Sequence, residues 1–373
     1  LFVGSVRCVY ETVFTQSTVR ASCVEICEKR IKSCSGLVRA ILINSGQANA
    51  CTGNFGTQHF LTATSKLSEL LGIKEKEVLM CSTGVIGVPI PINDLVKKLP
   101  KLVSELKANS FQNAAEAILT TDLTSKKIVI ETNIEGRKIR IAGLAKGSGM
   151  IYPNMATMLG FLTCDVGVEK EEWDKMISIA VKKSFNAISV DGETSTNDSF
   201  IGINSGKKIN KHYLPIIQSG IDIVCQHLAR NIARDGEGAN CLLEVVVQGA
   251  RNNDDAIMIA KSICNSALVK TAIHGCDPNW GRIISAAGNS GVEFNLNELD
   301  LYIGDFQILV KGILNQYDEQ KVTDYMKSRL KGKYLVEDIV RIVINLNSGQ
   351  SKGTAWGCDL SKKYVEINSE YTT

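Results

Sequence analysis

The chain has 373 residues, of which 44% are hydrophobic, so it is long enough to form one large domain or two ordinary ones with real cores. Its 42 basic and 39 acidic side chains leave a formal net charge of +3 and are spread along the chain, which argues against a nucleic-acid-binding tract. Since no apolar run reaches the roughly 18–20 residues that span a bilayer, we expect a soluble protein with no membrane partner.

Strand-like and helical stretches alternate throughout the chain, which is typical of a mixed α/β protein. Residues 37–43 are predicted to form a strand that ends in the turn-forming residues 44–46. Asn93 is expected to cap a helix that Pro100 kinks or splits, and a second helix is expected over 111–119. No Pro/Ser-rich linker divides the chain, so any domain boundary must be a tight one.

A hairpin is predicted over 127–132 and 137–142, because Glu135-Gly136 between them is a turn dipeptide. The remaining elements, predicted from apolar periodicity, are helices at 170–185, 214–232, 254–268 and 320–330 and strands at 241–247, 299–313, 338–346 and 364–367.

The most informative segment runs from Lys146 to Gly160 and places a glycine-rich turn and a proline before Ala156-Thr157. Glycine-rich backbone is able to hold a strained peptide bond, and the Thr157 hydroxyl is close enough in the chain to attack the Ala156 carbonyl. The resulting ester would hydrolyse and leave Thr157 as a new N-terminus. Its α-amino group, with a pKa near ~8, would then serve as the base that activates the hydroxyl. The alternative is that Ala156-Thr157 merely begins a buried strand.

Two other segments carry candidate groups. Thr83-Gly84 follows a strand-like run and is expected to aim a hydroxyl and a backbone N–H at an oxyanion, unless it is an ordinary turn. Glu237, in a glycine-rich stretch after a long helix, is suited to bind a substrate ammonium, unless it is only a solvated helix end. Gly349 to Gly353 matches the serine-hydrolase pattern Gly-x-Ser-x-Gly, but no amphipathic helix follows it, and no phosphate-binding loop is present.

The twelve cysteines form no Cys-x-x-Cys pair, which favours reduced, mostly buried thiols over a disulfide framework. His227 and His274 each lie two residues from a cysteine, but no second pair follows at zinc-site spacing, so we expect no metal ion and no resident cofactor. The expected compartment is the cytoplasm, or the plastid stroma or mitochondrial matrix if the source is eukaryotic. Because the chain does not begin with methionine, its true start and any targeting peptide stay open.

Together these segments resemble the ornithine acetyltransferase family, the glutamate N-acetyltransferases that recycle acetyl groups in arginine synthesis. The family signature at the self-cleavage site is intact from Lys146 to Leu159. Further segments that look like family motifs, in family order, are Asn44–Gly53, Cys81–Gly87, Thr120–Asp122, Val190–Asp198, Arg234–Gly238, Gly275–Arg282 and Asn368–Thr373.

The resemblance implies a four-layer αββα sandwich with a smaller C-terminal α/β domain. It also implies self-cleavage into residues 1–156 and 157–373, with the two fragments pairing again into an α2β2 assembly. The implied reaction is ping-pong: N-acetylornithine acetylates Thr157, and glutamate then takes the acetyl group. Whether acetyl-CoA also donates is left open by the sequence.

Carried over residue by residue, the resemblance makes Thr157 the nucleophile and makes Thr83 and Gly84 the oxyanion hole. Substrate contacts are implied for Thr120, Lys146, Thr157, Glu237, Asn368 and Thr373. Two alternatives to this function remain at this point. One is a related amidohydrolase or aminopeptidase that passes the acyl group to water, and the other is a binding protein that does not cleave itself.

Overall fold

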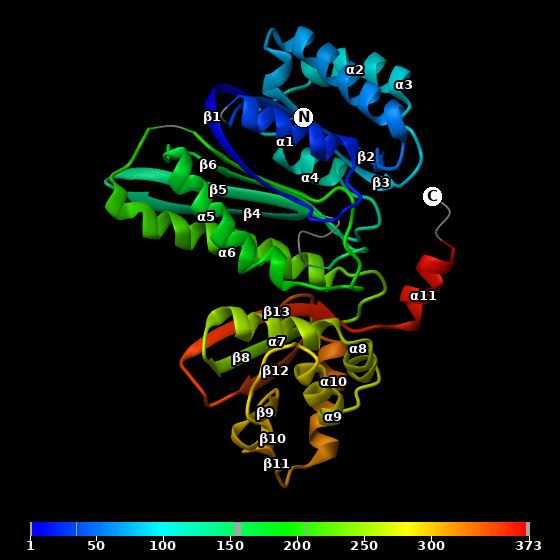
Figure 1. The fold of residues 1–373 in the computed structure, drawn as a ribbon, viewed down its shortest axis with the longest axis vertical. Coiled ribbons are helices and arrows are strands. Elements are labelled where there is room, and N and C mark those ends of the chain that lie inside the picture. The colour runs from blue at the N-terminus through cyan, green and yellow to red at the C-terminus, as the bar shows by residue number, and fades with distance from the viewer. Residues whose placement is uncertain (1, 35, 153–157, 206, 371–373) are drawn as a thin grey trace. The chain divides into compact units, whose positions relative to one another are not determined.

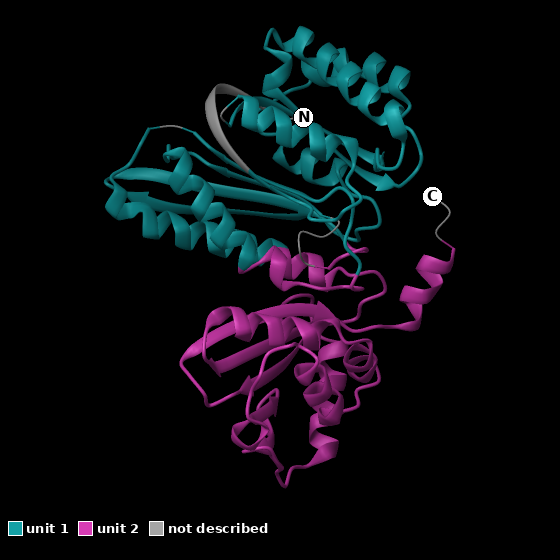
Figure 2. Ribbon diagram, in the orientation of Figure 1, with its two compact units in different colours: residues 1–147, 154–182, 193–228 teal, residues 148–153, 183–192, 229–373 magenta. Residues whose placement is uncertain are grey.

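The computed structural model describes residues 2–34, 36–152, 158–205 and 207–370. Side chains are described from Thr12 onward. These residues form two compact units (Figure 2). The first unit comprises Leu1–Gly147, Asn154–Lys182 and Glu193–Leu228, and the second comprises Ser148–Pro153, Lys183–Gly192 and Ala229–Thr373. The chain therefore enters the second unit just after Gly147 and returns to the first before residue 158.

The first unit is built on a seven-stranded sheet in the order β3-β2-β1-β7-β6-β5-β4 (Figure 1). β2–β3 and β6–β7 are parallel pairs and the other neighbours are antiparallel. The strands are β1 (Phe2–Phe14), β2 (Leu37–Gln47), β3 (Val78–Val85), β4 (Lys126–Ile134), β5 (Arg137–Lys146), β6 (Leu159–Cys164) and β7 (Ser199–Asn204).

Helices cover both faces of this sheet. On one face, apolar residues of α1 (Ser22–Ser33) and α2 (Gly53–Leu71) share a core with Leu144 of β5 and Phe161 of β6. On the other face, Trp173 of α5 (Lys170–Lys182) donates a hydrogen bond to the carbonyl of Gly202 at 3.1 Å. The remaining helices of this part of the chain are α3 (Ile92–Ser104), α4 (Phe111–Ala117) and α6 (Leu214–Arg234), whose last residues belong to the second unit.

Two local predictions in the first unit are wrong. Residues 44–46 are not a turn but continue β2, because β2 pairs in parallel with β3 as far as Gln47 opposite Val85. Pro100 neither splits nor ends α3, and the helix begins after Pro91 rather than at a cap on Asn93. The buried Leu99 shows that packing of the apolar face outweighs the one backbone hydrogen bond that proline cannot donate.

The second unit holds a six-stranded sheet in the order β11-β10-β9-β12-β8-β13, in which β8 and β12 are parallel. Its strands are β8 (Leu242–Ala250), β9 (Asp300–Ile303), β10 (Phe306–Val310), β11 (Ile313–Leu314), β12 (Ile339–Asn345) and β13 (Ser351–Cys358). Its helices are α7 (Asn253–Asn265), α8 (Ala267–His274), α9 (Trp280–Gly288), α10 (Glu319–Leu330) and α11 (Lys362–Ser369). Short 3-10 turns occur at Glu75–Glu77, Phe185–Ala187, Lys211–Tyr213 and Leu296–Glu298.

The second unit corrects two further predictions. Residues 364–367 are not a strand but part of α11, whose start is capped by the Ser361 hydroxyl accepting from the backbone N–H of Lys363. The helix predicted over 254–268 is two helices, because Ser266 ends α7 and caps α8 by accepting from the N–H of Val269. The Gly-x-Ser-x-Gly match begins the edge strand β13, where Ser351 is not at a nucleophile elbow.

The cysteines from Cys23 onward are free thiols in the described part of the chain, and all of these except Cys51 are buried. Among the described residues no single helix is long and apolar enough to cross a membrane. The helices α7 and α8 would be long and apolar enough only if taken together, and they are bent by 60° at the break between them.

Candidate active site

Lys146, the last residue of β5, brings two of the predicted site residues together. Its buried Nζ donates to Oγ1 of Thr83 at 3.1 Å and to Oγ1 of Thr120 at 2.8 Å. An ammonium group has only donors, so both hydroxyl oxygens accept here and each O–H is left to donate to a third group. Thr83 is buried whereas Thr120 is exposed, so the cluster opens to solvent on the Thr120 side.

Gly84 sits at a close approach of two backbones. The parallel pairing of β2 and β3 places it opposite Gly46, and its φ is +126°. A side chain at Gly84 would put Cβ 2.3 Å from the carbonyl carbon of Gly46, so only glycine fits. The motifs Asn44–Gly53 and Cys81–Gly87 therefore meet here. At position 84 the backbone has a conformation that residues other than glycine rarely adopt.

Asp122 is a site residue to which the sequence assigned no role. Its Oδ1 lies 2.6 Å from Nζ of Lys126 and accepts from the N–H of Gly147 at 2.6 Å, while its Oδ2 accepts from the N–H of Thr120 at 3.2 Å. Burial by itself would raise the pKa of Asp122, but Lys126, Lys146 and the Gly147 N–H together lower it below its ordinary value. Asp122 is therefore an ionised carboxylate that ties the Thr120 loop to the end of β5.

Thr157 lies outside the described residues, as do Ala156 and Thr373. The strand that follows is placed, however, because Leu159, two residues after Thr157, is the register partner of Lys146 in the β5–β6 pair. The chain that follows Thr157 therefore enters the sheet at Leu159, opposite Lys146.

The motif that ends in Asn197-Asp198 forms hydrogen bonds with backbone groups next to Thr83 and next to Thr157. Oδ1 of Asp198 accepts from the N–H of Met158 at 3.0 Å, and Nδ2 of Asn197 donates to the carbonyl of Ser82 at 2.9 Å. Burial raises the pKa of Asp198 well above its ordinary value, although the Met158 N–H and Lys146 oppose this shift. The signal in the sequence was a run of small polar residues directly before an apolar strand, here β7.

The second unit holds two other predicted substrate contacts, Glu237 and Asn368. Nδ2 of Asn368 on α11 donates to Oε2 of Glu237 at 2.9 Å. The backbone N–H of Glu237 donates to the carbonyl of Ser148 at 2.9 Å, and the Glu237 carboxylate lies so close to Gly149 that a Cβ there would be 2.6 Å away. Glu237 is therefore fixed against the start of the segment that leads to the predicted cleavage bond.

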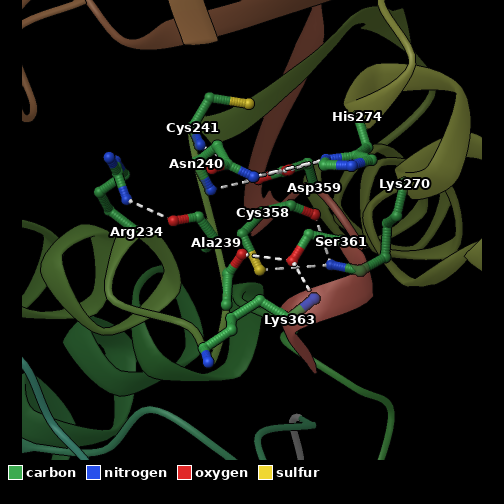
Figure 3. A network of polar contacts seen from close by, with 11 residues as sticks. Arg234, Ala239, Asn240, Cys241, Lys270, His274, Cys358, Asp359, Ser361 and Lys363 are labelled. Carbon is green, nitrogen blue, oxygen red and sulfur yellow. Dashed lines mark hydrogen bonds and ion pairs between the residues drawn. The ribbon is translucent and has the colours of Figure 1, made fainter. Parts of the chain in front are cut away.

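A polar network around Asp359 holds the loop that follows Glu237 (Figure 3). The fully buried Asp359 carboxylate accepts from the N–H of Asn240 at 2.7 Å, from the N–H of Cys241 at 3.1 Å and from the Asn240 side chain at 2.8 Å. Nδ1 of His274 lies 2.9 Å from the same carboxylate. On the α11 side, the Ser361 hydroxyl donates to the carbonyl of Gly238 at 2.6 Å, which links the loop to the helix that carries Asn368. Within the described residues, no group of three or more His, Cys, Asp or Glu side chains could hold a metal ion.

The model of the ArgJ family matches residues 1–373. The chain belongs to the ArgJ family. Among the relatives of this ArgJ-family chain, the arginine biosynthesis bifunctional protein ArgJ of Prochlorococcus marinus subsp. pastoris is 79% identical over 97% of this chain and 90% of its own length. The protein of the same name from Synechocystis sp. is 45% identical over 97% of this chain and 89% of its own length.

A solved structure agrees with this assignment. The crystal structure of the arginine biosynthesis bifunctional protein ArgJ from Bacillus halodurans is 39% identical, with a TM-score of 0.52, over 57% of this chain and 98% of that one. The family predicted from the sequence is therefore confirmed, and so is the predicted fold class, an α/β protein of the ornithine acetyltransferase type with two sheets.

Proposed function

We propose that this ArgJ-family chain transfers the acetyl group of N-acetylornithine to glutamate through an ester on Thr157. The proposal rests mainly on the Lys146 ammonium, which donates to the hydroxyls of Thr83 and Thr120. Lys146 lies on β5, opposite Leu159 of β6. The names of the relatives, arginine biosynthesis bifunctional proteins, supply the pathway.

In the first half-reaction, the α-amino group of Thr157 takes the proton of its own hydroxyl, and Oγ1 attacks the acetyl carbonyl of N-acetylornithine. The carbonyl oxygen becomes an oxyanion, which accepts from the Thr83 O–H and the Gly84 N–H. The C–N bond then breaks, the proton passes to the departing amine, and ornithine leaves. In the second half-reaction the amine of glutamate attacks the ester, and the proton that this amine loses passes through the Thr157 α-amino group to the leaving threonine oxygen, which releases N-acetylglutamate.

The substrate contacts have different tasks. Lys146, by donating to Thr83 and Thr120, fixes the hydroxyls and places a positive charge near the developing oxyanion. Glu237 binds an ammonium group of the amino-acid substrate, and Asn368 orients the Glu237 carboxylate. Thr373 contributes polar groups of the chain end to the same substrate.

Self-cleavage before Thr157 would produce fragments 1–156 and 157–373 that share one sheet. β1–β5 precede the cut and β6 and β7 follow it, and β7 pairs with β1 from Asn204 opposite Val9 to Ser199 opposite Phe14. Cleavage therefore removes one connection without separating the strands, and the fragments stay together. We further propose an α2β2 assembly and a cytoplasmic location, and acetyl-CoA as a second donor of the acetyl group.

The test is the variant Thr157→Ala, with the exposed Thr271→Ala of α8 as control. The wild-type and control chains are expected to give two fragments that meet at 156/157 in a mass spectrum, and the variant one chain of 40.6 kDa without transfer activity. A variant that is still cut there, or still transfers acetyl, contradicts the role of Thr157. Release of acetate from N-acetylornithine that glutamate does not redirect would show a hydrolase instead.

A further inference from the structure

Two lysines and one aspartate are buried together at the candidate active site. Asp122 and Lys126 have fully buried side chains, and that of Lys146 is 4% exposed. One carboxylate is thus shared between two ammonium groups in a place with little solvent to screen them. The sharing is unequal, because Nζ of Lys126 is 2.6 Å from Asp122 whereas Nζ of Lys146 is 3.9 Å from it.

We propose that Lys126 is a positioning residue, which pairs with Asp122 and thereby keeps the Lys146 ammonium on Thr83 and Thr120. This inference rests on the proposed function, since it gives Lys126 a task in assembling the oxyanion hole. Lys126 itself touches neither threonine. It acts by satisfying the carboxylate that would otherwise attract Lys146.

The physical reason is the cost of a buried carboxylate that lacks a close counterion. Removing one partner of a buried ion pair is strongly unfavourable, so the remaining carboxylate recruits whatever cation is within reach. Lys146 is already 3.9 Å away, and a lysine ammonium on a flexible four-carbon stem moves by such distances at little cost. Movement toward Asp122 would take its Nζ from Thr83 Oγ1, which it contacts at 3.1 Å.

The pair is also built to stay in place. Lys126, the first residue of β4, follows Asp122 by four residues, and its Nζ donates to the carbonyl of Thr124 at 3.2 Å as well. Asp122 in turn holds the N–H groups of Gly147 and Thr120. Lys126 therefore anchors a carboxylate that positions the backbone on both sides of the Lys146 ammonium.

Kinetics of acetyl transfer distinguish a charge partner from a packing residue. Lys126→Met keeps the length of the side chain and is expected to lower kcat about 100-fold with little change in KM, as for the loss of an oxyanion donor. Lys126→Arg keeps the charge and is expected to restore kcat to within about fivefold of the wild type. The control is Lys138→Met, because Lys138 is 62% exposed and pairs with Glu131 on the same hairpin. A Lys126→Met enzyme with wild-type kcat overturns the proposal.

A double variant covers the case in which Lys126→Met fails to fold. Asp122→Asn with Lys126→Met removes both charges, so the side chain at position 122 no longer attracts Lys146. Its kcat is expected to lie within about threefold of that of Asp122→Asn alone, because Lys126 acts through this carboxylate and has no further effect once the carboxylate is gone. A double variant about tenfold or more slower than Asp122→Asn shows that Lys126 acts in another way and overturns the proposal.

A crystal structure of Lys126→Met, or of T157A/K126M if the single variant gives no crystals, tests the position of Lys146 without any activity. The expected result is Nζ of Lys146 at hydrogen-bond distance from Asp122 and no longer on Thr83. Nζ still on both threonines would refute the inference. If the wild-type chain transfers no acetyl group, the proposed function fails, while this structural result still decides the role of Lys126.

Discussion

The Lys146 cluster of the first unit and the Glu237–Asn368 contact of the second are built differently. Lys146 and Thr83 are only 3% and 2% exposed, and the cluster is held by strand ends and a buried carboxylate. Asn368, in contrast, is exposed and lies on α11, a helix without a buried residue. A group that must stabilise a developing charge is most effective when it is fixed in advance and shielded from water. A group that binds and releases substrates tolerates exposure and movement.

The largest expected effect tests the fixed region. Thr83→Val removes the hydroxyl that is proposed to donate to the oxyanion and should lower kcat by about 10²–10³-fold. Thr64→Val is the matched control, because Thr64 is also buried in the first unit but bonds only to backbone carbonyls of its own helix. Steady-state kinetics of both variants give the comparison, and an unchanged kcat for Thr83→Val would remove this residue from the oxyanion hole.

The next effect tests the Glu237–Asn368 contact of the second unit. Glu237→Gln removes a charge that is proposed to bind a substrate ammonium and should raise KM for N-acetylornithine by about 10–100-fold, with a smaller change in kcat. Glu366→Gln on α11 serves as control, since that carboxylate is exposed and pairs with Lys363. A fall in kcat with no change in KM would mean that Glu237 belongs to the chemistry rather than to substrate binding.

Asp198 gives a pH-dependent test of the buried polar groups. Burial raises its pKa in the folded protein, whereas an unfolded aspartate has a pKa near ~3.9. Between pH ~4 and the folded pKa the folded state therefore binds more protons than the unfolded state, and the free energy of unfolding falls as pH rises through this range. Asp198→Asn, which is neutral at every pH, should flatten this dependence in urea unfolding between acidic and neutral pH. Equal pH slopes for both proteins would show that Asp198 is ionised when folded.

The smallest effect concerns the attachment of α11. Ser361→Ala removes both the helix cap and the bond to the Gly238 carbonyl, and should destabilise the helix locally by about 1 kcal/mol. Hydrogen exchange at the α11 amides should become faster, while KM rises only a few-fold. Exchange as slow as in the wild type would mean that other contacts hold the helix.

Much of the fold and of the candidate site follows from local sequence. The β4–β5 hairpin is one example, since Glu135 and Gly136 adopt the positive φ values, 53° and 73°, that its turn requires. The motifs likewise identified Thr83, Thr120 and Lys146, which the structure brings together, and Glu237 and Asn368, which it brings into contact. Self-cleavage at Thr157 stays a prediction from the sequence motif.

Only the tertiary structure decided the groups that act across long separations. Asn197 donates to a carbonyl of β3, which lies far away in the sequence. The role proposed for Lys126 depends on Lys146, because both lysines lie beside the Asp122 carboxylate. The same holds for α11, predicted as a strand, and for α3, which runs through Pro100. Local propensity is weak compared with packing and hydrogen bonding in three dimensions, so a sequence shows which residues carry chemistry more readily than which neighbours hold them in place.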